Sequence, residues 1–189
     1  MNFGKIIDLA RQELGFLFRD VVINTVISST LVPRTLRATL VRLVGHRGVS
    51  SRALISPGVF LGARTGLTME PGTIINYGSF LDLGAPVTMA ENAGVGYEVM
   101  LITCSHEMGP SHRRYGVADN RPIVIGAGAW VGSRATILPG VTVGAGCVIG
   151  VGSVVTADCV DNGVYMGTPA RLIRILDDAE PRSELSANA

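Results

Sequence analysis

Residues 125–160 read IGAGAW VGSRAT ILPGVT VGAGCV IGVGSV VTADCV when they are written in groups of six. Each group begins with a β-branched aliphatic residue, and these are Ile125, Val131, Ile137, Val143, Ile149 and Val155. The second position is Gly in four of the six groups, and the fifth is always small or β-branched. Because Ile and Val together make up 36 of 189 residues, such a register arises by chance about 5 times in 100,000.

A repeat of six residues matches neither a helix nor a hairpin and indicates a parallel β-helix, an all-β solenoid. Each group supplies one short strand and one corner. The aliphatic residue points inward and stacks on its equivalents in neighbouring coils. Gly is expected at the corner because a Cβ would clash there.

A weaker form of the pattern precedes residue 102, and an ordinary β-sandwich with short strands fits this part equally well. Its leading positions, with shifts of phase between coils, are Ile55, Leu61, Leu67, Met69, Ile75, Leu81, Met89, Val95 and Leu101. The longest break follows as ITCSHEMGPSHRRYGVADNRPIV, residues 102–124. We expect a loop that protrudes from the solenoid here, and it contains two of the three histidines.

The first 52 residues show helical spacing instead. Residues 1–52 carry eight cations against three acids. A second helix is expected from Pro33 to Gly45, with Leu36, Leu40 and Leu43 on one face and arginines elsewhere. Two interpretations stay open: the helices cover the open end of the solenoid, or they form a basic amphipathic element that touches an anionic membrane surface.

Composition narrows the class of protein. With 47% hydrophobic and 16% charged residues, intrinsic disorder is excluded. Three cysteines without a close pair favour neither a disulfide framework nor a cysteine-rich zinc site. The start lacks the build of a signal peptide, and the longest charge-free stretch near it, 21–33, is too short to span a bilayer. We expect a cytoplasmic chain with a helical segment at 1–52, a β-helix domain at 53–175 and a flexible acidic tail at 176–189.

Four segments of the sequence resemble the hexapeptide-repeat acyltransferases when they are taken in order. They are INYGSFLD, TCSHEMG, the repeat run from Pro122 and GTPARLIRIL. The resemblance is to O-acetyltransferases of the maltose, galactoside and colanic-acid type and covers about residues 55–175. It implies a left-handed parallel β-helix and a homotrimer. It also implies acetyl-CoA as donor and a sugar or glycan acceptor of the kind used in polysaccharide biosynthesis, with neither a metal nor nucleic acid.

The resemblance assigns His106 as the general base, since a sugar hydroxyl needs a base with a pKa near 7. Asn76 matches a residue that holds the acceptor beside the histidine of a neighbouring subunit, and Asp82 lies where an acceptor-binding carboxylate is common. Asn76 has an alternative as a corner residue in the left-handed conformation. His112 is expected to be a solvated loop residue, and covalent catalysis by Cys104 is a minor alternative.

The resemblance places Trp130 at the thiol end of the donor and Ser133, Val151 and Thr156 along its groove. Arg171 and Arg174 suit the nucleotide phosphates, with solvated end-cap residues as the alternative. Ala157 departs from the lysine common in the family, so one phosphate contact is in doubt.

Three other functions compete with the O-acetyltransferase interpretation. Serine acetyltransferases share the solenoid, but their usual Asp-Arg-His-Pro segment is absent. A γ-carbonic-anhydrase-like zinc site needs three histidines, and His46 lies outside the solenoid pattern. A non-catalytic scaffold is disfavoured by the presence of His106, Trp130 and Arg171.

Overall fold

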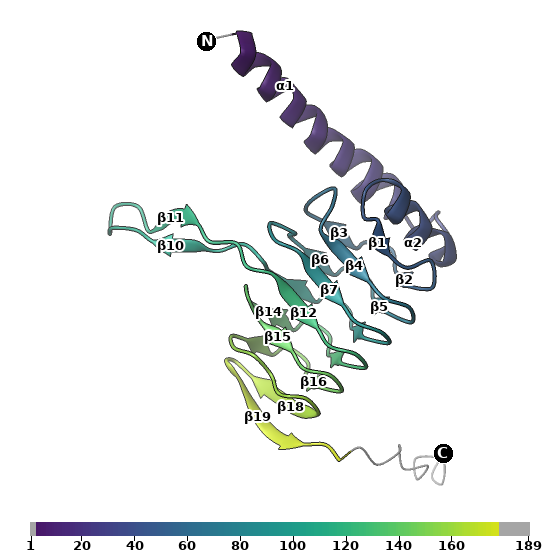
Figure 1. Cartoon of the computed structure of the whole chain (residues 1–189), viewed down its shortest axis with the longest axis vertical. Helices are drawn as coiled ribbons and strands as arrows, with labels where there is room; N and C mark the ends of the chain where they lie inside the picture. Colours follow the sequence, from purple (N-terminus) through teal and green to yellow (C-terminus); the bar gives the residue numbers. More distant parts are fainter. Residues whose placement is uncertain (1–2, 178–189) are drawn as a thin grey trace.

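The computed structural model describes residues 3–177 and shows a parallel β-helix with three faces (Figure 1). We name the faces sheets A, B and C. Sheet A holds β1 (Gly48–Val49), β4 (Leu67–Met69), β7 (Val87–Met89), β12 (Ile123–Ile125) and β15 (Thr142–Val143). Sheet B holds β2 (Leu54–Ile55), β5 (Ile74–Ile75), β8 (Gly94–Val95), β13 (Trp130–Val131), β16 (Val148–Ile149), β18 (Gly163–Gly167) and β19 (Ala170–Ile175). Sheet C holds β3 (Phe60–Leu61), β6 (Phe80–Leu81), β9 (Met100–Leu101), β14 (Thr136–Ile137) and β17 (Val154–Val155).

The leading aliphatic residues form the core, as predicted. In sheet B, Ile75 pairs with Ile55 and Val95, and Val131 pairs with Val95 and Ile149. All leading residues predicted from Ile55 to Val155 are buried. The parallel β-helix is therefore confirmed for the early coils as well, where the sandwich was an alternative.

The early shifts of phase have a simple cause in sheet A. Strands β4 and β7 are three residues long and turn two residues inward, as Leu67 and Met69 do in β4. Each early coil is therefore 20 residues long rather than 18, as the pairing of Met69 with Met89 shows.

At each corner of the solenoid, the glycine of the repeat and the left-handed turn fall at different positions. At the second position of the repeat, a Cβ on Gly126 would lie 2.6 Å from Ala145 N, and one on Gly132 would lie 2.7 Å from Ile149 O. The left-handed backbone falls two residues later, at Gly128 with φ 65° and at Arg134 with φ 59°. The predicted clash is therefore with the next coil, and the turn itself is made elsewhere.

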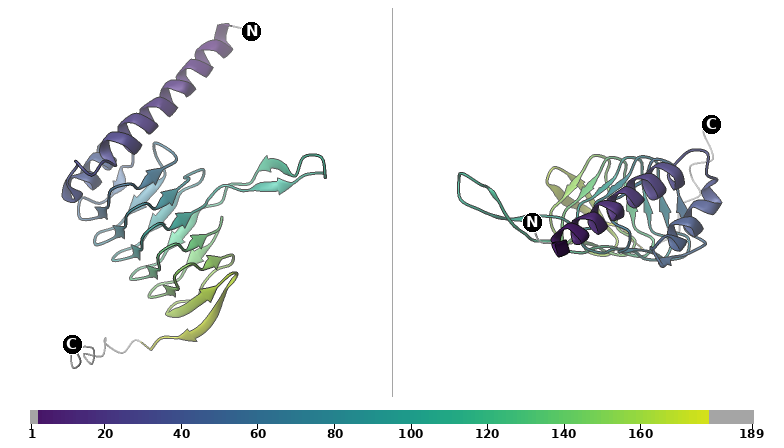
Figure 2. Two further views of the ribbon diagram at one scale, coloured as in Figure 1. Left: turned by 180° about the vertical axis from the view of Figure 1, so that it is seen from behind. Right: turned by 90° about the horizontal axis from the view of Figure 1, so that it is seen from above.

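Three helices precede the solenoid: α1 (Phe3–Phe18), the π-helix η1 (Arg19–Ile27) and α2 (Arg34–Leu43). Helix α2 packs against β1 and β2, and η1 packs against β3. Helix α1 extends away from the solenoid (Figure 2). The predicted covering of the solenoid end thus holds for η1 and α2, whereas, among the described residues, α1 touches the core only through Phe18 at its end.

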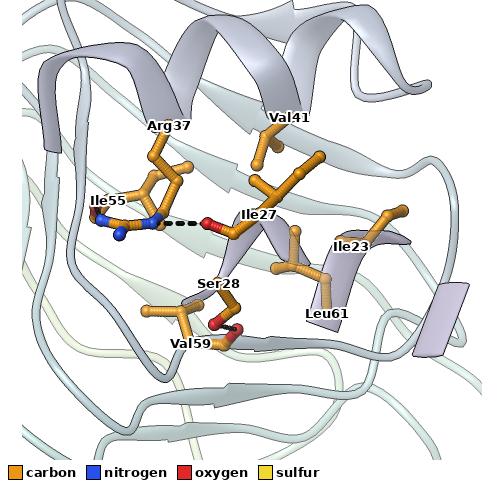
Figure 3. Close-up of a pocket in the computed structure, with 8 residues that line it drawn as sticks. All are labelled: Ile23, Ile27, Ser28, Arg37, Val41, Ile55, Val59 and Leu61. Atoms are coloured by element: carbon orange, nitrogen blue, oxygen red, sulfur yellow. Dashed lines mark hydrogen bonds between the residues drawn. The ribbon is translucent and has the colours of Figure 1, made fainter. Parts of the chain in front are cut away.

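The buried face of α2 is Arg37, Ala38 and Val41. Of the predicted face, Leu40 packs against the core but Leu36 and Leu43 are exposed. The reason is the guanidinium of Arg37, which is 1% exposed (Figure 3). It donates to the carbonyl oxygens of Ile27, Ser29, Val32 and Ile55 at 2.6 to 2.8 Å. These bonds join η1, the following loop and β2 to α2, so a cation rather than a leucine anchors this helix.

The break at residues 102–124 is a protruding β-hairpin made of β10 (His106–Met108) and β11 (Tyr115–Ala118). It leaves the solenoid between β9 and β12 (Figure 1). At the other end of the chain, β18 and β19 pair as an antiparallel hairpin that extends sheet B. Most of the predicted flexible tail lies outside the described residues.

Candidate active site

The predicted site residues fall on two different edges of the solenoid. We call the edge that follows the strands of sheet B the BC edge, and the edge that follows those of sheet C the CA edge. The BC edge holds Asn76 after β5, Ser133 after β13 and Val151 after β16. The CA edge holds Asp82 after β6, the hairpin with His106 after β9, and Thr156 after β17. Sheet C separates the two groups, so one chain assembles two partial sites.

The ring of His106 is held on the hairpin by one strand and one aromatic neighbour. Its Nδ1 lies 3.1 Å from the carbonyl oxygen of Gly116, and its ring meets that of Tyr115 edge-on at 5.8 Å. A carbonyl oxygen only accepts, so Nδ1 carries the proton in the neutral ring. The remaining nitrogen, Nε2, is then an acceptor on an exposed side chain. This arrangement suits a general base.

Asp82 holds the segment that leads into the same hairpin. Its carboxylate accepts from the backbone N–H groups of Thr103 and Cys104 at 3.0 Å, from that of Gly84 at 3.3 Å, and from the Thr103 hydroxyl. Burial alone raises the pKa of this carboxyl, but the hydrogen bonds outweigh it and the pKa lies below its ordinary value. The carboxylate therefore stays ionised and ties β6 to the chain that leads into the hairpin.

Cys104 lacks the surroundings of a reactive thiol. Burial and the negative charge of Asp82 raise the pKa of this cysteine above its ordinary value. A raised pKa reduces the thiolate fraction at neutral pH. The surroundings of Cys104 thus disfavour the covalent alternative.

On the BC edge, the side-chain Nδ2 of Asn76 donates to the carbonyl oxygen of Val95 at 3.1 Å. Asn76 does not have the left-handed conformation of the corner residues, so the structural alternative given for it was wrong. Beside it, the rings of Tyr77 and Tyr97 stack with their centroids 6.0 Å apart, and both are exposed. Aromatic faces of this kind bind the apolar faces of ligands.

This tyrosine pair escaped the sequence prediction. The spacing of the two tyrosines could have revealed it. Leading residues that stack in neighbouring coils, such as Ile75 and Val95, lie 20 positions apart, and so do Tyr77 and Tyr97. Phe60 and Phe80 repeat it in sheet C, with stacked rings 4.8 Å apart.

Trp130 lies on the outer face of sheet B, between Gly94 and Val148 in the parallel ladder. Because Gly94 has no side chain, the indole is exposed along that side. Ser133 accepts through its Oγ from the backbone N–H of Tyr97 at 3.1 Å. Val151 is also exposed. Trp130 and Val151 thus face solvent, while Ser133 is bound to the preceding coil.

Arg171 and Arg174 lie in β19, where they pair with Met166 and Val164 of β18. Strand β19 is the outermost strand of sheet B. Both side chains are exposed. They therefore stand at the end of the same sheet that carries Trp130, whereas Thr156 and Ala157 stand on the CA edge.

The remaining histidines lie in different parts of the fold. His46 is buried, and its Nδ1 accepts from the backbone N–H of Leu67 at 3.3 Å. His112 is exposed near the tip of the hairpin. Among residues 3–177 no group of three or more His, Cys, Asp or Glu side chains is placed to hold a metal ion. None of the helices described is long and apolar enough to cross a membrane.

Comparison with known proteins gives the family of these repeats. Residues 122–157 match the bacterial transferase hexapeptide (six repeats) family. Galactoside O-acetyltransferase of Escherichia coli (strain K12) is 34% identical over 126 residues, which are 59% of this chain and 62% of that protein.

Two solved structures share the fold and part of the sequence. A hexapeptide-repeat acetyltransferase of Vibrio cholerae O1 biovar eltor, complexed with acetyl coenzyme A, has a TM-score of 0.74 and 27% identity over 85% of this chain and 86% of that one. A galactoside acetyltransferase in complex with coenzyme A has a TM-score of 0.67 and 26% identity over 94% of this chain and 85% of that one. Among the curated relatives, the chain spans between 42% and 62% of the length of those it matches first.

Proposed function

Because the chain is a hexapeptide-repeat β-helix protein with acetyltransferases among its relatives, we propose that it is an O-acetyltransferase. It transfers an acetyl group from acetyl-CoA directly to a hydroxyl of a sugar or glycan. The use of acetyl-CoA implies that the reaction takes place in the cytoplasm.

The observation that carries this proposal is the orientation of His106. With Nδ1 bound to the Gly116 carbonyl at 3.1 Å, Nε2 takes the proton of the acceptor hydroxyl as its oxygen attacks the acetyl carbonyl carbon. The ester bond forms, the thioester bond breaks, and coenzyme A leaves as a thiolate that takes up this proton from His106. The hairpin holds the ring in one tautomer, as a general base requires. Asp82 positions that hairpin through its bonds to Thr103 and Cys104.

The two partial sites support a homotrimer. His106 and Asn76 lie on different edges of one solenoid, with sheet C between them. Cyclic packing that sets the CA edge of one chain against the BC edge of the next brings the base beside the acceptor residue. Each complete site then combines the His106 of one chain with the Asn76, Tyr77 and Tyr97 of another.

The donor binds along sheet B in this proposal. Acetyl-CoA supplies an activated acyl group as a thioester. Trp130 borders the reactive end, and backbone groups near Ser133 and Val151 meet the amides of the pantetheine arm. Arg171 and Arg174 at the end of the sheet meet the phosphates.

The direct test is acetylation by the purified chain with labelled acetyl-CoA and a panel of acceptors: maltose, a galactoside, a nucleotide-sugar and an amino sugar. We expect a labelled O-acetyl ester on at least one sugar. Transfer to none of them would contradict the proposal. If the purified chain held a zinc ion tightly and hydrated carbon dioxide, the γ-carbonic-anhydrase-like function would be favoured instead.

A further inference from the structure

The outer surface of α2 combines exposed leucines with arginines that have no acidic neighbours in sequence. Between Asp20 and Glu70 the chain contains six arginines and no Asp, Glu or Lys. We define the cap face as Leu36 and Leu43 on the outer side of α2, Arg42 beside them, and Arg47 just past the end of the helix. All four side chains are exposed.

The leucines of the cap face point outward because Arg37 has taken the inner side of the helix. Leu36 is 54% and Leu43 is 75% exposed, while Ala38 and Val41 on the opposite side are buried. In the loop just before α2, Leu31 is 90% exposed. A helix that turns leucines to solvent and buries an arginine is the reverse of the usual arrangement.

The arginines of the cap face are available for an external anion. Within residues 3–177 neither Arg42 nor Arg47 forms an ion pair. Apolar side chains flanked by unpaired cations on a short helix are the features of an interfacial helix on anionic lipid. We infer that the cap face binds the surface of an anionic membrane, with Leu36 and Leu43 entering the headgroup region and the arginines meeting lipid phosphates.

Charge distinguishes this face from α1. Helix α1 also exposes apolar residues, including Leu14 and Leu17, but its two cations are matched by Asp8 and Glu13. Electrostatics therefore selects α2, and not α1, as the element that meets anionic lipid.

Vesicle flotation of the full chain tests this inference. The vesicles consist of phosphatidylcholine alone or of phosphatidylcholine mixed with phosphatidylglycerol. We expect binding to the anionic vesicles only, with a loss of binding as salt is raised. A chain that stays unbound at low salt with the anionic vesicles would overturn the inference.

Two pairs of substitutions identify the face. Leu36→Ser with Leu43→Ser should lower the affinity for anionic vesicles about tenfold or more, while Val160→Ser at the far end of the solenoid should not. Arg42→Gln with Arg47→Gln should lower it about fivefold per arginine and weaken its salt dependence. Arg134→Gln, which removes one cation elsewhere on the surface, is the control and should keep the affinity of the parent chain.

Equal binding by the variants and their controls would overturn the inference. So would a change in the oligomeric mass of the leucine variant with vesicle binding intact, because the face would then be a protein interface. The inference does not rest on acetyl transfer. Acetylation of a soluble sugar by the same preparations separates failure of membrane binding from failure of the proposed function.

Discussion

The ring of His106 is the single side chain on which the proposed chemistry depends. Replacing it with Ala removes the acceptor nitrogen but leaves sheet B and its donor residues intact. We expect His106→Ala to lower kcat by about a hundredfold or more while KM for acetyl-CoA changes little, because a general base acts in the transition state. Steady-state kinetics check this. His112→Ala, on the same hairpin, is the control and should keep activity; comparable kcat in both variants would remove His106 from the mechanism.

His46 gives a residue-scale prediction about stability. Burial lowers the pKa of His46 from 6.5 to about 4. Between pH 6.5 and pH 4, His46 is therefore protonated in the unfolded chain but neutral in the folded chain. The free energy of unfolding is highest above this range and falls as the pH drops toward 4. Between pH 7 and pH 5 this costs about 2 kcal/mol.

Urea unfolding at the two pH values measures this loss. His46→Asn keeps an acceptor for the Leu67 N–H and removes the titration, so its free energy of unfolding should change less between pH 7 and pH 5 than that of the parent chain. An identical pH dependence in both chains would show that His46 is not the group responsible.

At the scale of elements, the β18–β19 hairpin links the end of the chain to the donor. In our proposal each of these charges meets a phosphate of the donor, so Arg171→Ala and Arg174→Ala should each raise KM for acetyl-CoA several-fold. Acetyl-pantetheine lacks the nucleotide, and its KM should be nearly unchanged. Equal effects on both donors would mean that the arginines act in folding or assembly.

The elements also show where prediction from sequence succeeded and where it failed. The β-helix was predictable because its buried aliphatic residues recur in a fixed register. The strands of the protruding hairpin were not, because β10 buries no residue and β11 nearly none, so no alternation marks them. The orientation of α2 was mispredicted because four carbonyl oxygens hold the Arg37 guanidinium, and hydrophobic spacing carries no information about such bonds.

For the whole molecule, the resemblance already implied that Asn76 acts beside the histidine of a neighbouring subunit. The structure adds that Asn76 follows sheet B and the His106 hairpin follows sheet C, so the two residues lie on different edges of one chain. The periodicity of the sequence could not supply this placement for the early coils, because its shifts of phase leave open which corner each residue occupies. In our proposal the complete site therefore forms only in an assembly.

Co-expression of two inactive variants, His106→Ala and Asn76→Ala, tests the shared site most directly. In trimers assembled at random from equal amounts, an intact base and an intact Asn76 meet at about one interface in four. We predict that the purified mixture recovers about a quarter of the parent chain's acetyltransferase activity, although neither variant alone is active. No recovery in trimers shown by mass to contain both variants would contradict the shared site.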